Sequence, residues 1–279
     1  MSYLAPTKIA DAIDYLGARQ ATIIAGCTDY FPARQPHQIF DPLLDITRLE
    51  GFRGISETEN AWRLGAATTW TDLIKAPLPT GFDGLKLAAR EVGSVQIQNR
   101  GTLAGNICNA SPAADGIPPL LALDAQVEIT GKEGTRILAL GAFIKGARDI
   151  ALGPAELVSA ILIPKQVAQS QSAFLKLGSR THLVISIAMV AVCLELSGKR
   201  ITSARVAVGS CSPMARRLPE LERFLAGKAA IDITAAGFDA EEHFAPLSPI
   251  TDVRGSAEYR LDAVPELCRR AVFQAMAAA

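Results

Sequence analysis

The hydrophobic pattern of the first half of the chain predicts short strands interspersed with helices. Residues 8–16 have helical spacing, because Ile9, Ile13 and Leu16 fall on one face. Short apolar runs bounded by glycine, proline or polar residues are typical of strands. Such runs cover residues 21–25, 42–46, 62–66, 126–130 and 157–164. Further helices are predicted at residues 71–74, 85–92 and 118–123.

A composition break at residues 165–172 divides the pattern into two predicted domains. This stretch is polar and shows no core pattern, as is typical of a linker. We therefore expect domains at residues 1–165 and 173–279. In the second domain the apolar run at residues 183–196 predicts one buried element, and residues 197–200 predict a hairpin turn. Helices are predicted at residues 219–225, ending before Gly227, and from about 264 to 277.

Composition and charge remove several classes of function. The 279 residues carry 28 Lys and Arg against 28 Asp and Glu, so the formal net charge is zero. A nucleic-acid partner is not expected, because binding would need a basic surface that releases counterions. The run at residues 183–196 is interrupted by Ser186 and Glu195. It is also shorter than the roughly 20 apolar residues that span a bilayer, so no membrane span is expected.

The cysteines and histidines do not form a metal-binding pattern. Five cysteines occur without any Cys-x-x-Cys pair, so we expect neither a zinc site nor an iron–sulfur site. Their odd number, together with the lack of a signal peptide, predicts a reducing cytoplasm. His37, His182 and His243 are far apart in the sequence. We expect them to be surface or hydrogen-bonded residues.

Two glycine-containing stretches are candidates for binding a large, phosphate-bearing cofactor. In the first, Ile23-Ile24-Ala25-Gly26-Cys27-Thr28-Asp29, a strand ends in a glycine turn; the second runs from Gly101 to Asp115. The structural alternative for the first stretch is an ordinary turn with an Asp cap. For the second stretch it is a loop in which Ser111 or Asp115 caps a helix. Together they favour a cradle of backbone N–H groups. The chain has neither a Gly-x-Gly-x-x-Gly motif nor a P-loop.

Longer motifs connect these stretches to a known family. Residues 25–29 match an Ala-Gly-Gly/Cys-Thr-Asp loop, and residues 65–69 match a Gly-Ala-x-Thr-Thr strand. Residues 97–115 match Ile-Arg-Asn-x-Gly-Thr-x-Gly-Gly-Asn-Ile-x-Asn-Ala-Ser-Pro-x-x-Asp. Residues 256–260 and 269–271 extend the match over essentially the whole chain. The chain thereby resembles the FAD-binding medium subunits of molybdenum hydroxylases, such as those of carbon monoxide dehydrogenase and xanthine dehydrogenase.

The resemblance implies a fold, a cofactor and a set of binding residues. The fold is α+β, with an FAD-binding domain of the FAD-linked oxidase (PCMH) type, in subdomains of about 1–55 and 56–165, before a smaller α+β domain. FAD is the implied cofactor, and residues 23–30 would wrap its diphosphate. The implied cofactor-binding residues are Ile23, Ile24, Ala25, Gly26, Cys27, Thr28, Asp29, Tyr30, Thr102, Gly105, Asn106, Asn109, Asp115, Val158 and Lys176.

Two of these residues have more specific implied roles. Lys176 by itself is typical of a surface lysine. The resemblance instead places it close to the flavin ring, as the one candidate for tuning the flavin. Asp115 cannot help to bind a phosphate, but it can accept a hydrogen bond from a sugar or ribityl hydroxyl.

The resemblance also implies a place in an electron-transfer complex. In the family, a molybdenum-cofactor subunit oxidises the organic substrate, and [2Fe–2S] clusters on another subunit carry electrons to the flavin. NAD or another acceptor then takes them. Two alternatives stay open: a cofactor-less binding module, and a stand-alone FAD oxidoreductase. Gln98 and Ala104 depart from the motif, where the family has arginine and glycine. A methyl group at position 104 requires a negative φ there.

Overall fold

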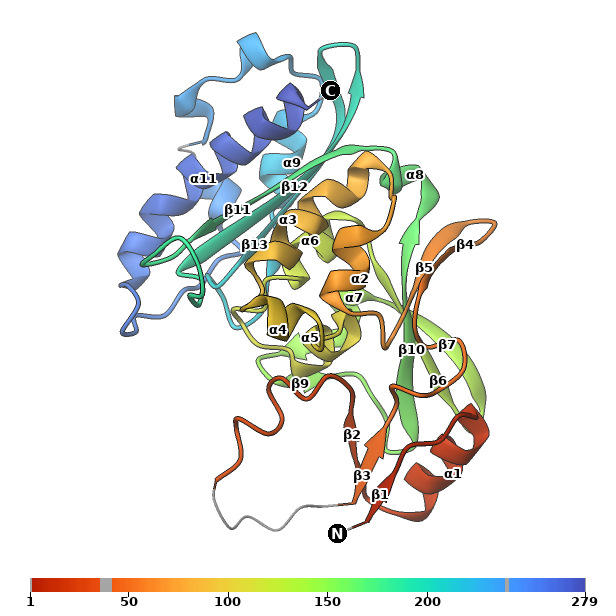
Figure 1. Cartoon of the computed structure of the whole chain (residues 1–279). Helices are drawn as coiled ribbons and strands as arrows, with labels where there is room; N and C mark the ends of the chain where they lie inside the picture. Colours follow the sequence, from red (N-terminus) through yellow and green to blue (C-terminus); the bar gives the residue numbers. More distant parts are fainter. Residues whose placement is uncertain (1, 36–41, 239–240, 279) are drawn as a thin grey trace.

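A small parallel sheet begins the chain. The computed structural model describes residues 2–35, 42–238 and 241–278. Strand β3 (Leu43–Asp45) lies between β1 (Tyr3–Leu4) and β2 (Thr22–Ile24), parallel to both. Helix α1 (Ile9–Ala18) joins β1 to β2 and buries Ala12 and Leu16 in the core. This part forms the lower end of the molecule in Figure 1.

A five-stranded antiparallel sheet forms the centre of the first domain. Its order is β4-β5-β10-β6-β7. The middle strand β10 is long because both neighbours pair with it along most of its length. The bounds are β4 (Ile55–Glu57), β5 (Ala61–Gly65), β6 (Gln126–Gly131), β7 (Gly134–Ala139) and β10 (Glu156–Pro164).

Short helices connect these strands and fill the space between the sheets (Figure 1). Helix α2 begins with a capping box, in which the Thr69 side chain and the Asp72 carboxylate each accept from the other residue's backbone N–H. A small hairpin of β8 (Ile144–Gly146) and β9 (Asp149–Ile150) follows α7. The helices are α2 (Trp70–Lys75), η1 (Thr80–Phe82), α3 (Asp83–Glu91), α4 (Val95–Gln98), α5 (Leu103–Asn109), α6 (Ile117–Ala122) and α7 (Leu140–Phe143).

The second domain is a four-stranded antiparallel sheet covered on both faces. Along β12, Ala188, Val190 and Val192 pack in the core that includes helix α11 (Ala257–Ala277). The alternate residues Met189 and Ala191 pack in the core of the first domain. Because successive side chains of a strand point to opposite faces, burial of both faces explains the continuous apolar sequence. Its strands are β11 (Gln171–Leu177), β12 (Ala188–Ser197), β13 (Arg200–Gly209) and β14 (Arg216–Arg217).

Helices α9 and α11 cover the outer face of this sheet (Figure 1). Helix α11 begins at Ala257, seven residues earlier than predicted, where the Ser256 side chain accepts from the Tyr259 N–H. The remaining helices of the described chain are α8 (Lys165–Ala168), α9 (Pro219–Leu225), η2 (Ala230–Asp232), η3 (Ala235–Phe238), α10 (Glu241–Phe244) and α11 (Ala257–Ala277). None of the described helices is long and apolar enough to cross a bilayer.

Three sequence predictions need correction. Residues 165–172 are not a solvated linker: Val167 is 1% exposed, and the Ser172 hydroxyl accepts from the Gly84 N–H. The run at residues 183–196 is not one buried element, because the strand begins only at Ala188 and Leu183 is 55% exposed. His243 is buried, and its Nδ1 atom has no partner within the described ranges. His182 is exposed as expected, and His37 lies outside the described residues.

An ion-pair network joins the two domains. The Asp124 carboxylate accepts from the guanidinium groups of Arg205 on β13 and Arg217 on β14. Arg205 also pairs with Glu195, and Arg217 with Glu222. Charged hydrogen bonds of this kind fix geometry as well as contribute energy. The network therefore helps to hold the second sheet against the first domain.

Candidate functional site

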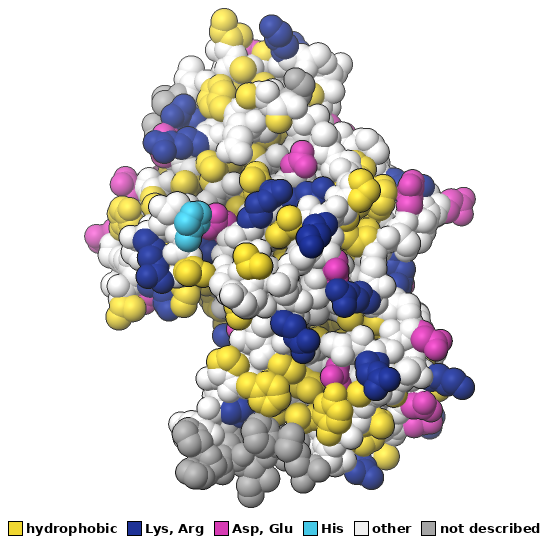
Figure 2. All heavy atoms as spheres, viewed as in Figure 1, with side chains coloured by type: hydrophobic (Ala, Val, Ile, Leu, Met, Phe, Trp, Pro, Cys, Tyr) yellow, Lys and Arg dark blue, Asp and Glu magenta, His cyan; other side chains and the backbone are white. Residues whose placement is uncertain are grey.

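A large cavity lies between the lower and central parts of the first domain and the edge of the second. Its volume is about 1420 Å³, larger than the roughly 300–1,000 Å³ of a typical small-molecule pocket. Figure 2 shows that the outline of the surface narrows at the left, just above the lower end of the molecule. Four segments supply most of the wall: the β2 loop (residues 25–30), the α5 segment (residues 101–115), the β8–β9 hairpin with the residues after it, and residues 183–185.

The cavity collects all but one of the residues that the sequence nominated. Lys176 is the exception, because it lies on the wall of a second cavity of about 540 Å³. Glu91, at the end of α3, lines both cavities. The nominated residues on the large cavity are Ile23, Ile24, Ala25, Gly26, Cys27, Thr28, Asp29, Tyr30, Thr102, Gly105, Asn106, Asn109, Asp115 and Val158.

The β2 loop and the α5 segment meet at a glycine. A Cβ atom added at Gly26 would lie 1.9 Å from the carbonyl oxygen of Arg100, where no heavy atom fits. A Cβ atom added at Gly101 would lie 3.4 Å from the Thr28 hydroxyl oxygen. Only glycine at position 26 therefore lets the two backbones come together at this point.

The β2 loop offers backbone donors that have no partner in the described part of the chain. The N–H groups from Gly26 to Tyr30 have no acceptor among the described residues. Cys27 has a φ of 60°, which turns the chain sharply after β2. Unpaired N–H groups are costly when buried away from water. A row of them on a cavity wall is therefore suited to an anionic ligand such as a diphosphate.

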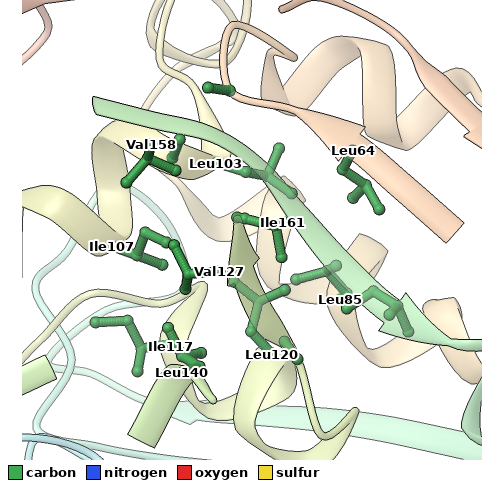
Figure 3. Packing of buried hydrophobic residues seen from close by; sticks show 14 of the residues in the cluster. Leu64, Leu85, Leu103, Ile107, Ile117, Leu120, Val127, Leu140, Val158 and Ile161 are labelled. Atoms are coloured by element: carbon green, nitrogen blue, oxygen red, sulfur yellow. The ribbon is translucent and has the colours of Figure 1, made fainter. Parts of the chain in front are cut away.

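The α5 segment, predicted as a loop, contains the helix α5. The Thr102 side chain caps the helix by accepting from the Gly105 N–H at 2.9 Å. Leu103 and Ile107 are fully buried against β10 and its neighbours (Figure 3). Ala104 lies within this helix and is 3% exposed, so its methyl group is accommodated. The Asn106 Oδ1 atom is buried and has no partner among the described residues, which suits a ligand with a hydroxyl or N–H donor.

Asp115 and Lys176 form a buried ion pair across the domain junction. The Lys176 ammonium lies 2.8 Å from Asp115 Oδ2, and the two side chains are 7% and 11% exposed. The Ser186 hydroxyl donates to Asp115 Oδ1 at 2.7 Å. Burial raises the pKa of the Asp115 carboxyl, and the Lys176 ammonium and the Ser186 hydroxyl offset part of that rise. Lys176 is thus connected to the large cavity through its contact with Asp115.

The capping alternatives for Asp115 and Ser111 are wrong. Helix α6 begins after Gly116 and has no side-chain cap. The Ser111 hydroxyl accepts instead from the Ala113 N–H, within a turn.

The cysteines of the cavity wall are neutral thiols. Burial raises the pKa of Cys108 to about 12 and also raises the pKa of Cys27. Since the thiolate is the nucleophile and the metal ligand, neither residue is activated for such chemistry near neutral pH. No cluster of three or more His, Cys, Asp and Glu side chains suited to a metal occurs in the described part of the chain.

Sequence reasoning missed the far wall of the cavity. Arg148 and Ile150 of the β8–β9 hairpin line it, as do Leu183, Val184 and Ile185. None of them belongs to a motif. For Leu183 to Ile185, the only signal was that they follow Lys176 closely in the sequence.

Comparisons with known proteins decide the family. A family model described as the FAD binding domain in molybdopterin dehydrogenase matches residues 1–166. A second, described as the CO dehydrogenase flavoprotein C-terminal domain, matches residues 173–275. The chain belongs to this FAD-binding family. FAD is therefore its cofactor, and the predicted α+β FAD-binding fold followed by a second domain is confirmed.

The relatives described below match this chain over nearly all of its length. A xanthine dehydrogenase FAD-binding subunit from Escherichia coli is 30% identical, covering 100% of this chain and 97% of the relative. The nicotine 6-hydroxylase medium subunit of Paenarthrobacter nicotinovorans is 29% identical, covering 98% and 96%. Among solved structures, a CO dehydrogenase from Oligotropha carboxidovorans superposes with a TM-score of 0.92 at 30% identity, covering 100% and 98% of the two chains.

The cavity of this FAD-binding subunit fits the cofactor in three respects. Within the described chain the N–H groups of the β2 loop have no acceptor, which suits a diphosphate, and the Asn106 Oδ1 atom lacks a partner. The Asp115 carboxylate uses one hydrogen bond on each oxygen, and a carboxylate can accept about four. It can therefore still accept from a hydroxyl of FAD.

We expect Gly26→Val to abolish FAD retention while the chain stays folded. The added side chain would collide with the Arg100 carbonyl group and force the β2 loop away from the α5 segment. Gly105→Val should have the same effect, because its Cβ would lie 2.9 Å from the Thr102 hydroxyl oxygen. Absorbance at 450 nm after gel filtration measures retention. Gly17→Val is the matched control, since a Cβ there meets nothing within 4 Å. Full flavin occupancy in both cavity variants would contradict the cradle.

We expect Asp115→Ala to weaken FAD binding by about 1–3 kcal/mol, the usual cost of losing a charged hydrogen-bond partner. The variant also leaves the Lys176 ammonium buried without its carboxylate. Its apo form should therefore unfold more easily, by about 3–5 kcal/mol. Flavin titration and urea unfolding of the apo form separate the two effects. Unchanged flavin affinity would exclude Asp115 as a cofactor ligand.

Proposed function

We propose that this chain is the electron-transfer flavoprotein of a molybdenum hydroxylase. It takes electrons from the [2Fe–2S] clusters of one partner subunit and delivers them to NAD or another acceptor. A second partner, which holds the molybdenum cofactor, oxidises the organic substrate. The observation that carries the proposal is the match of the whole chain to FAD and medium subunits of such enzymes.

The protein's own contribution is to hold FAD and to set the charge around it. FAD, when bound, supplies the exchange between one-electron and two-electron transfer. The β2 loop and the α5 segment bind the cofactor through backbone and amide groups. Lys176 and Asp115 together place one positive and one negative charge beside the cavity. Their balance tunes the affinity of the site for an anionic, reduced cofactor.

NAD as the electron acceptor and a cytoplasmic location of the protein stay predictions. The location was predicted from the cysteine pattern. We also propose a boundary between the domains at residues 165–172, a stretch that includes the short helix α8.

The experiment uses the purified complex with its iron–sulfur and molybdenum partners. On addition of the organic substrate, the flavin band at 450 nm should bleach in the complex. It should stay unchanged when this chain alone, loaded with FAD, meets the same substrate. Bleaching by the chain alone would favour a stand-alone oxidoreductase. No bleaching in a complex whose clusters are reduced would refute electron transfer to this flavin.

Substitutions at the ion pair should shift the two-electron flavin potential in opposite directions. Lys176→Met leaves the Asp115 carboxylate without its cation, which disfavours reduction and lowers the potential. Asp115→Asn leaves the Lys176 charge uncompensated and raises the flavin potential. A charge effect of about 1.4 kcal/mol corresponds to about 30 mV for a two-electron couple, so shifts of that order are expected. Spectroelectrochemical titration measures both, and shifts of the same sign would contradict the tuning role.

A further inference from the structure

Arg148 is attached to the end of helix α5 at three points. Its backbone N–H donates to the Ala110 carbonyl at 2.9 Å. Its guanidinium donates to the Asn109 carbonyl at 2.9 Å and also to the Asn109 side-chain oxygen. Arg148 lies in the turn of the β8–β9 hairpin with a φ of 61°, a conformation that residues other than glycine rarely adopt. The hairpin and the end of α5 are therefore bound together at the cavity wall.

This contact fixes the orientation of the Asn109 amide. A guanidinium has only donors, so the Asn109 side chain must turn its oxygen, not its NH₂ group, toward Arg148. The Asn109 NH₂ group then lies on the other side of the amide, away from Arg148. Asn109 lines the large cavity. Phosphate, hydroxyl and flavin carbonyl oxygens of FAD all accept hydrogen bonds, so an amide held with its donors free suits this cofactor.

The charged groups around the cavity leave the Arg148 guanidinium available to hold the Asn109 amide. Among the described residues, no carboxylate forms an ion pair with Arg148. The carboxylates of Asp115 and Glu156, which also line the cavity, pair with Lys176 and Arg136. Asn109 therefore supplies two of the three oxygens that Arg148 binds in the described structure.

We infer that Arg148 is a positioning residue for FAD, which acts by holding the Asn109 amide with its NH₂ group toward the cofactor. The inference concerns cofactor binding alone, so it stands whether or not the chain receives electrons from an iron–sulfur partner. It assigns a function to a residue outside every motif of the sequence.

A double-mutant cycle on the deflavinated protein tests the inference. Arg148→Met and Asn109→Ala should each raise the dissociation constant for FAD about tenfold, as expected for one hydrogen-bonding unit. The double variant should bind no more weakly than Asn109→Ala alone, because Arg148 acts on FAD through the Asn109 amide, which Asn109→Ala has already removed. If the dissociation constant of the double variant rises by the product of the two single effects, the inference is contradicted. An unchanged constant in Arg148→Met would contradict it as well.

Asn109→Asp separates binding from folding. The carboxylate would still accept from Arg148 and form an ion pair with it, so the melting temperature of the apo form should not fall. It has no N–H donors, so FAD affinity should fall at least as far as in Asn109→Ala. Lys145→Met is the matched control, because it removes a charge from the same hairpin, where Lys145 pairs with the exposed Asp149. Wild-type FAD affinity in Asn109→Asp would overturn the inference.

Discussion

The close approach of Gly26 to the Arg100 carbonyl is the constraint on which the cofactor site depends. It brings two segments some seventy-five residues apart in the chain into backbone contact, where a Cβ would lie 1.9 Å from an oxygen. The residues after Gly26, whose N–H groups have no acceptor within the described chain, line the same cavity as the α5 segment. A site built from backbone groups needs few basic side chains, and in the described lining of the cavity the basic residues are Arg34 and Arg148.

The second domain contributes charge and position to this site. The sheet that carries Lys176 packs on the first domain with one face and on α11 with the other. Lys176 on β11 and Ser186 before β12 both bind Asp115 of the first domain. The Asp124 network holds the same sheet from a different place. Electrostatic tuning of the cavity is thus coupled to how the two domains pack.

Local sequence patterns predicted much of the fold and two of the four segments that line the cavity. The glycine and asparagine motifs located nearly all residues of the β2 loop and the α5 segment, because such residues have few other reasons to cluster. They did not reveal helix α5, since Gly105 and Asn106 are poor helix formers and burial of Leu103 and Ile107 decides the conformation. The Lys176–Asp115 pair and the Arg148 contact join residues 61 and 39 positions apart, so no local pattern contains them.

The most direct measurement is the identity and amount of the flavin bound by the purified chain. The two-segment cradle predicts one FAD per chain, released intact on denaturation and identified by chromatography. The apo form should take up FAD but not FMN, because FMN lacks the diphosphate that the β2 loop is suited to bind. Equal binding of FMN, or no flavin uptake by the folded apo form, would contradict the proposed cradle.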